Sequence, residues 1–146
     1  MNNKIYNEDL KKVWRPNWLS RINELTSLEL QKRSWLDNDA PSPHWSFVEF
    51  MCSYFDDLGV ENAYKDPLVR GLLSKQEFDI IKEWHDVLDK YNSPNDDDYN
   101  VANILSDPKW LEILELGIVA KNNLAKVLSE SERQFLTEEI DHRKYG

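Results

Sequence analysis

The stretch SPHWSFVEFMCSYFDDLG at residues 42–59 decides the fold of this chain. Ser42 followed by Pro43 is typical of a helix start, because a serine side chain caps free backbone N–H groups and proline suits the first helical turn. The residues that follow are apolar on nearly every side of a predicted helix over 43–58, and Gly59 is suited to end it. A helix of this kind is buried, so we expect it to stand at the centre of the molecule.

Helix-start signals recur on both sides of this segment. A serine or threonine followed three residues later by glutamate forms a capping box, and the pattern occurs at Thr26, Ser74 and Ser129. Asp107 followed by Pro108 repeats the arrangement found at 42–43. Predicted helices therefore cover residues 17–24, 27–36, 75–91, 108–128 and the segment after 129, with shorter pieces over 60–73 and a polar loop over 92–98.

Proline and glycine set the remaining limits on the fold. Proline disfavours a helical conformation in the residue before it, so Pro16 places the start of the first helix near Asn17. Residues 1–16 are then expected to be a flexible or loosely packed segment of a single domain over 1–146. The chain has only four glycines, which disfavours hairpins and phosphate-binding loops that need positive φ. The prediction is an all-α protein, a compact bundle of about six or seven helices around the helix at 43–58.

Composition narrows the class of protein further. The chain has 146 residues, one cysteine and a net charge of -9. One cysteine cannot form an intramolecular disulfide or a cysteine-based zinc finger, and an acidic chain is a poor general binder of nucleic acid. No apolar run approaches the length of a membrane helix, and the start of the chain is too polar for a signal peptide. We therefore expect a soluble cytoplasmic protein without a cofactor.

His85 is the histidine with the clearest chemical context, because Asp86 adjoins it and Asp89 lies one helical turn later. A metal-dependent or acid–base enzyme built on these three residues is one hypothesis. The alternative, which we prefer, is a surface histidine whose acidic neighbours raise its pKa, since no second histidine or cysteine pair completes a site. Cys52 is predicted to be a small buried apolar residue rather than a nucleophile. The chain is therefore predicted not to be an enzyme.

The acidic loop has the spacing of a calcium-binding loop at its start only. Asp96, Asp98 and Asn100 match the first EF-hand ligands, but Val101 stands where the turn requires glycine and Asp107 where a bidentate glutamate is usual. We expect a solvated surface loop, with weak binding of divalent cations as the alternative.

Charge is distributed unevenly along the chain. Residues 1–36 carry seven basic and four acidic side chains, a net charge of about +3. Residues 37–66 carry seven acidic side chains against one lysine, and residues 77–98 carry eight against two, so each block is about -6. If the two blocks lie together, they form an acidic face that would attract a basic partner and speed its binding. An acidic surface that serves solubility alone is the alternative.

The order of aromatic and charged residues resembles that of small acidic helical immunity proteins from bacterial toxin–immunity loci. The residues that carry the resemblance are the patterns WLxRxxELT at 18–26, WL at 35–36, FxCxYFDDL at 50–58 and DPxW at 107–110. It covers much of residues 17–115 and brings no catalytic residues with it. The resemblance implies stoichiometric binding of a delivered toxin, often a basic nuclease.

An inhibitor of a nuclease benefits from carboxylates in the places of substrate phosphates and from aromatic side chains at the centre of the contact. The candidate partner-binding residues are Asp56, Asp57, Glu61, Asp86, Asp89, Asp96, Asp97, Asp98 and Tyr99. Tyr54 and Tyr91 are either further contacts or core residues. An acidic adaptor or DNA mimic that binds a basic cellular protein is the rival binding hypothesis, and a homodimer through apolar helix faces stays open.

Overall fold

The structure of the protein, a computed structural model, describes residues 3–36 and 46–137, with side chains from Asn7 onward. Within these ranges every regular element is a helix, which confirms the predicted all-α class. The helices are α1 (Asn3–Thr26), α2 (Leu28–Leu36), α3 (Phe47–Phe55), α4 (Lys65–Val69), α5 (Lys75–Asp89), the short 3-10 helix η1 (Pro94–Asp96), α6 (Val101–Leu105), α7 (Pro108–Ala125) and α8 (Glu130–Thr137). None of these described helices is both long enough and apolar enough to cross a bilayer.

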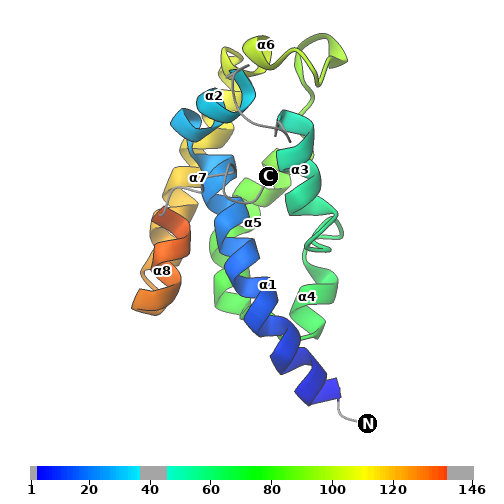
Figure 1. The fold of residues 1–146 in the computed structure, drawn as a ribbon, viewed down its shortest axis with the longest axis vertical. Coiled ribbons are helices and arrows are strands. Elements are labelled where there is room, and N and C mark those ends of the chain that lie inside the picture. Colours follow the sequence, from blue (N-terminus) through cyan, green and yellow to red (C-terminus); the bar gives the residue numbers. More distant parts are fainter. Residues whose placement is uncertain (1–2, 37–45, 138–146) are drawn as a thin grey trace.

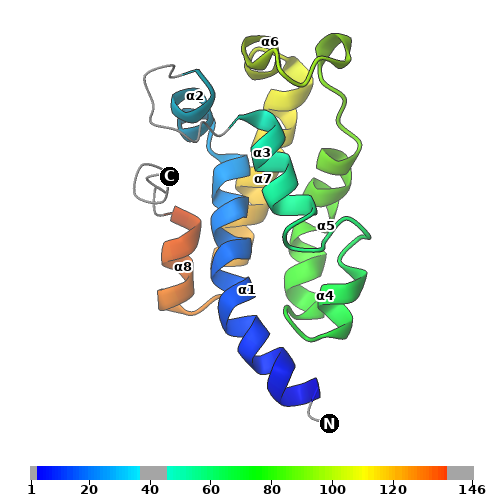
Figure 2. The same ribbon diagram turned by 45° about the vertical axis from the view of Figure 1, so that its right-hand side comes forward.

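Helix α1 runs through the middle of the bundle (Figures 1 and 2). Helices α2, α3, α7 and α8 all pack against α1, and α5 packs along α7. The prediction that a helix over 43–58 stands at the centre was therefore wrong. The 24 residues of α1 present a longer buried face than the nine residues of α3, which lies at the flank of α1. Ser46 is the N-cap of α3, whereas Ser42 and Pro43 lie outside the described residues.

Helix α1 continues through Pro16, so the predicted start near Asn17 was also wrong. A proline inside a helix removes one backbone hydrogen bond and crowds the preceding turn. Tertiary contacts on both sides of Pro16 compensate for this loss. Trp14 is buried and its Nε1 donates to the carbonyl of Leu58 (2.9 Å), and its ring stacks on Trp18 with centroids 5.2 Å apart. The part of 1–16 whose side chains are described thus includes core residues.

The predicted break between α1 and α2 is confirmed, but Ser27 rather than Thr26 caps the second helix. The backbone N–H of Leu30 donates to Ser27 Oγ (3.2 Å). Gln31 then joins three segments from a fully buried position. Its Nε2 donates to the carbonyl of Glu24 (2.9 Å), and its Oε1 accepts from Trp110 Nε1 on α7 (3.0 Å).

Several other local predictions agree with the structure. Ser74 and Glu77 form a capping box at α5, and Asp107 caps α7. Gly59 has φ +68 in the turn that follows α3, a conformation that favours glycine. Helix α7 ends at Ala125, three residues earlier than predicted, and α6 was not predicted.

Gly117 allows α7 to approach its neighbours closely. A Cβ atom at this position would lie 2.6 Å from Thr26 Cγ2 on α1 and 2.6 Å from Trp84 Nε1 on α5. Both neighbours are buried and have little room to move. The glycine therefore determines how near α1, α5 and α7 pack.

Candidate partner-binding surface

Two of the predicted site residues, Asp96 and Asp98, line a groove between α3 and residues 91–98. Figure 1 places the start of α3 beside this segment, which leads from α5 towards α6, and residues of both line the groove. The groove has a volume of about 320 Å³. The residues that line it are Phe47, Val48, Met51 and Cys52 of α3 together with Tyr91, Asn92, Ser93, Asp96 and Asp98. This α3 groove combines an apolar wall with an acidic rim.

Hydrogen bonds hold the acidic rim in place. Ser93 is buried, and its Oγ donates to Asp98 Oδ1 (2.6 Å). Tyr91 Oη donates to Asp107 Oδ2 (2.7 Å), while the other oxygen of Asp107 accepts from the backbone N–H of Lys109 (3.1 Å). The segment is therefore tied to the N-terminus of α7.

Asp98 and Asn100, two of the residues with the spacing of a calcium-binding loop, form hydrogen bonds to nearby residues. Asp98 accepts from Ser93, and Asn100 caps α6 by accepting from the backbone N–H of Asn103 (3.2 Å). Asp96 has φ 56, in the left-handed region, and is exposed. In the part of the chain that the structure describes, no group of three or more His, Cys, Asp or Glu side chains is placed to hold a metal ion.

The predicted carboxylates lie at the surface. Asp86 is half-buried, and the other seven are exposed: Asp56, Asp57, Glu61, Asp89, Asp96, Asp97 and Asp98. Among residues 7–36 and 46–137, none of these eight forms an ion pair with a lysine or arginine. They are therefore available to cations from outside the described chain.

The structure brings only some of these carboxylates to the groove. Asp96 and Asp98 line it directly. Asp56 and Asp57 do not line it, but both carboxylates raise the pKa of the Cys52 thiol, which lies on the opposite wall. Glu61, Asp97 and the 80 % exposed Tyr99 do not line the groove. Asp86 and Asp89 do not line the groove either, so Asp96 and Asp98 are the two of the nine predicted residues that it brings together.

Cys52 was predicted to be buried, but it is exposed and lines the α3 groove. Because α3 is apolar on most sides, helical periodicity could not decide which side faces the core; Phe50 and Tyr54 face it and are fully buried. Partial desolvation raises the pKa of the Cys52 thiol, and the Asp56 carboxylate raises it further. A thiol with a raised pKa stays protonated at neutral pH, so Cys52 is a poor nucleophile.

The three tyrosines near this surface have different environments. Tyr54 is fully buried, which makes it a core residue. Tyr91 is half-buried, with its ring centroid 5.1 Å from that of Trp110, and it contributes to one wall of the groove. Tyr99 is exposed, as predicted.

His85 is buried, so the prediction of a surface histidine was wrong. It ends a chain of buried hydrogen bonds that begins at Trp18, whose Nε1 donates to Tyr64 Oη (2.9 Å). The hydroxyls of Tyr64 and Tyr54 are hydrogen-bonded to each other, and Tyr54 Oη lies 2.8 Å from His85 Nδ1. Because the indole can only donate, every hydroxyl in the chain is satisfied when Tyr64 donates to Tyr54 and Tyr54 donates to Nδ1. This arrangement places the proton of neutral His85 on Nε2.

Burial also reverses the expected shift of the His85 pKa. Desolvation lowers it and outweighs Asp89 and Asp86, which raise it. The sequence had allowed a buried position, since residue 85 lies two turns after Phe78 on the face that α5 buries. His85 lines neither the α3 groove nor the pocket around Arg15 described next.

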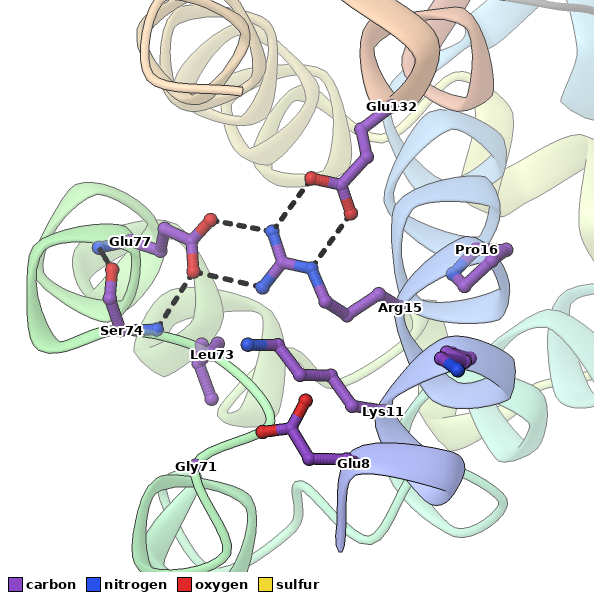
Figure 3. Close-up of a pocket in the computed structure, with 10 residues that line it drawn as sticks. Glu8, Lys11, Arg15, Pro16, Gly71, Leu73, Ser74, Glu77 and Glu132 are labelled. Carbon is purple, nitrogen blue, oxygen red and sulfur yellow. Dashed lines mark hydrogen bonds and ion pairs between the residues drawn. The ribbon is translucent and has the colours of Figure 1, made fainter. Parts of the chain in front are cut away.

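Arg15, which sequence reasoning did not select, connects three helices. Figure 3 shows its guanidinium on α1 between Glu77 of α5 and Glu132 of α8, beside a pocket of about 640 Å³. Arg15 Nε donates to Glu132 Oε2 (2.7 Å), and its Nη2 donates to Glu132 Oε1 (3.2 Å) and to Glu77 Oε2 (2.7 Å). Nη1 donates to Glu77 Oε1 (3.0 Å) and to the carbonyl of Leu72 (3.1 Å). All five N–H donors of the side chain are used.

Each ion in this Arg15 site depends on its partners. Burial alone would lower the pKa of Arg15, but the hydrogen bonds that Arg15 donates to Glu77 and Glu132 outweigh this effect and raise the pKa. Burial alone would raise the pKa of Glu77, but Arg15 and the Ser74 backbone lower it. The three ionised side chains thus hold α1, α5 and α8 together, with no donor of Arg15 left for a ligand.

Comparison of the chain with protein-family models, with curated proteins and with solved structures finds no match.

Proposed function

We propose that the protein is a non-enzymatic immunity protein that binds and neutralises a cognate bacterial toxin through its acidic surface. The observation that carries this proposal is the state of the carboxylates. Glu77 and Glu132 are paired with a buried arginine, whereas the candidate carboxylates, including those at the α3 groove, have no cationic partner within the described chain. Unpaired carboxylates beside an apolar wall suit a basic protein partner.

A basic nuclease is the toxin class that fits this surface best. Such an enzyme binds the phosphates of its substrate with Lys and Arg side chains, and surface carboxylates can take the places of those phosphates. Opposite charges also accelerate association by about 10–10³-fold at low salt. An inhibitor that must capture a toxin before it acts in the cytoplasm gains from both effects.

The test of this proposal uses the protein encoded beside this gene. We expect that protein to arrest growth when expressed alone, and co-expression of the present chain to restore growth. Size-exclusion chromatography with light scattering should then show an equimolar complex of the two purified proteins. Absence of both rescue and complex would refute the proposal, and a complex with a basic host protein instead would favour an acidic adaptor or DNA mimic.

Charge-reversal variants test whether the two carboxylates that line the α3 groove make the contact. Asp96→Lys combined with Asp98→Lys should weaken the complex by about 100-fold, because both substitutions place like charges against a basic partner. Glu115→Lys combined with Glu130→Lys reverses the same number of exposed charges on α7 and α8. This matched control should change the dissociation constant by less than about threefold, measured by isothermal titration calorimetry.

A further inference from the structure

We propose that the α3 groove receives one apolar side chain from a basic segment of the partner, with a Lys or Arg on each side of that residue. The inference rests on the proposed function and adds the chemistry of the contact to it. An acidic surface alone attracts any basic protein, whereas an apolar anchor between two cations selects a particular segment.

The apolar wall of the groove is open to such an anchor. Val48 and Met51 are half-buried and line the groove together with the buried Phe47. A volume of about 320 Å³ leaves room for an apolar side chain. Methionine adapts its shape readily, so Met51 can fit side chains of different outline.

Carboxylates stand on both sides of this wall. Asp96 and Asp98 belong to the loop side of the groove, and Asp56 lies close to Cys52 on the α3 side. The described residues that line the groove include no Lys or Arg. A cation on each side of the anchor would therefore meet a carboxylate that has no Lys or Arg partner in the described chain. Anionic ligands are disfavoured at the same place, and so is a second copy of this chain, whose net charge is -9.

Both sides of the groove are already fixed without a partner. Tyr54 and Phe50 anchor α3 in the core, and the Ser93–Asp98 hydrogen bond holds the loop. A preformed groove lowers the ordering cost of binding, so one anchor side chain can contribute measurable affinity.

The cysteine of the groove provides a direct measure of its occupancy. Cys52 is the single cysteine of the chain, is exposed and lines the groove. The probes are two synthetic peptides of equal charge, acetyl-KRLRK-amide and acetyl-KRGRK-amide. Alkylation of Cys52 by iodoacetamide at alkaline pH, where part of the thiol is ionised and reacts, followed by mass spectrometry, gives the dissociation constant of each peptide from its protection of the thiol. We expect the leucine peptide to bind about tenfold more tightly, since only its apolar side chain can fill the groove.

Two variants complete the experiment. Met51→Lys should remove the difference between the peptides, whereas Val69→Lys, at an 81 % exposed position on α4, should preserve it. Circular dichroism and thermal melting establish that both variants fold. Equal protection by the two peptides in the wild type, or no protection by either, would overturn the inference.

The toxin partner separates this inference from the proposed function. If the Asp96→Lys and Asp98→Lys pair weakens the toxin complex but Met51→Lys does not, the function stands and the anchor is refuted. If the leucine peptide is preferred but the neighbouring gene product is neither bound nor neutralised, the groove stands and the immunity function is refuted.

Discussion

At the Arg15 site two carboxylates share one buried guanidinium, whereas at the α3 groove the carboxylates face solvent without a cation from the described chain. The first site is formed by α1, α5 and α8, and the second by α3 and residues 91–98. Both sites contain carboxylate side chains of the same small acidic protein.

The difference shows how burial decides what a carboxylate does. A buried charge loses its hydration, so Glu77 requires the hydrogen bonds from Arg15 that replace it. An exposed carboxylate keeps its water and needs no partner for the protein to fold. It therefore remains free to bind a cation from another molecule, which is the property that the proposed function uses.

The largest effect should come from breaking the Arg15 site. Arg15→Met leaves Glu77 and Glu132 without their cation, and we expect the free energy of unfolding to fall by about 3–5 kcal/mol. Urea denaturation followed by circular dichroism measures this loss. Adding Glu77→Gln and Glu132→Gln to the same chain should recover part of it, because no uncompensated charge remains. A loss below about 1 kcal/mol for Arg15→Met would mean that the site contributes little to stability.

A smaller effect should follow from cutting the hydrogen-bond chain beneath α3. Tyr54→Phe leaves the Tyr64 hydroxyl and His85 Nδ1 without the partner they share. We expect a loss of about 1–3 kcal/mol in the free energy of unfolding, the usual cost of unpaired buried polar groups. Tyr99→Phe removes a hydroxyl from an 80 % exposed side chain and serves as the control. Equal stabilities for the two variants would show that the hydrogen bonds between Tyr64, Tyr54 and His85 do not stabilise the fold.

The pH dependence of stability should distinguish the paired carboxylates from the exposed ones. The pKa of Glu77 is lowered from 4.5 in the folded protein, so its contribution is present above pH 4.5 and is lost as the pH falls through the lowered pKa. The lowered pKa of His85 reduces stability at a higher pH than Glu77 does, because the unfolded chain takes up a proton near pH 6.5 while the folded protein does not. Stability should therefore fall on acidification in both ranges.

Glu77→Gln isolates the acidic range. Denaturation curves of this variant should show a shallower loss of stability below pH 4.5 than the wild type, with the change near pH 6.5 retained. An unchanged slope below pH 4.5 would show that Glu77 is not the group responsible.

The smallest effect on stability should come from the exposed carboxylates. Asp56→Asn removes an exposed charge that has no cationic partner in the described chain. We expect the free energy of unfolding to change by less than about 0.5 kcal/mol. In the same variant, binding of the toxin should weaken and depend less steeply on salt. A large loss of stability would place Asp56 with the structural carboxylates instead.

The sequence by itself determined most of the local structure. Ser74 and Asp107 cap their helices as predicted because a cap requires only residues within one turn. The exposure of Asp96 to Asp98 followed from their polarity, since charged side chains are almost never buried without a partner. Periodicity also placed residue 85 near the buried face of α5, although it could not choose between a surface and a core histidine.

The tertiary structure alone decided which elements meet. Glu77 and Glu132 lie 62 and 117 residues from Arg15, and no local pattern links charges at those separations. Helix α1 passes through Pro16 because contacts with distant residues outweigh a purely local preference. Cys52 faces the groove because α3 is apolar on most sides, so its orientation depended on neighbouring helices. Helix caps depend on adjacent residues, so the sequence predicts them. The pairing of distant segments depends on the free energy of the whole packed core, so the position of the α3 groove followed only from the tertiary structure.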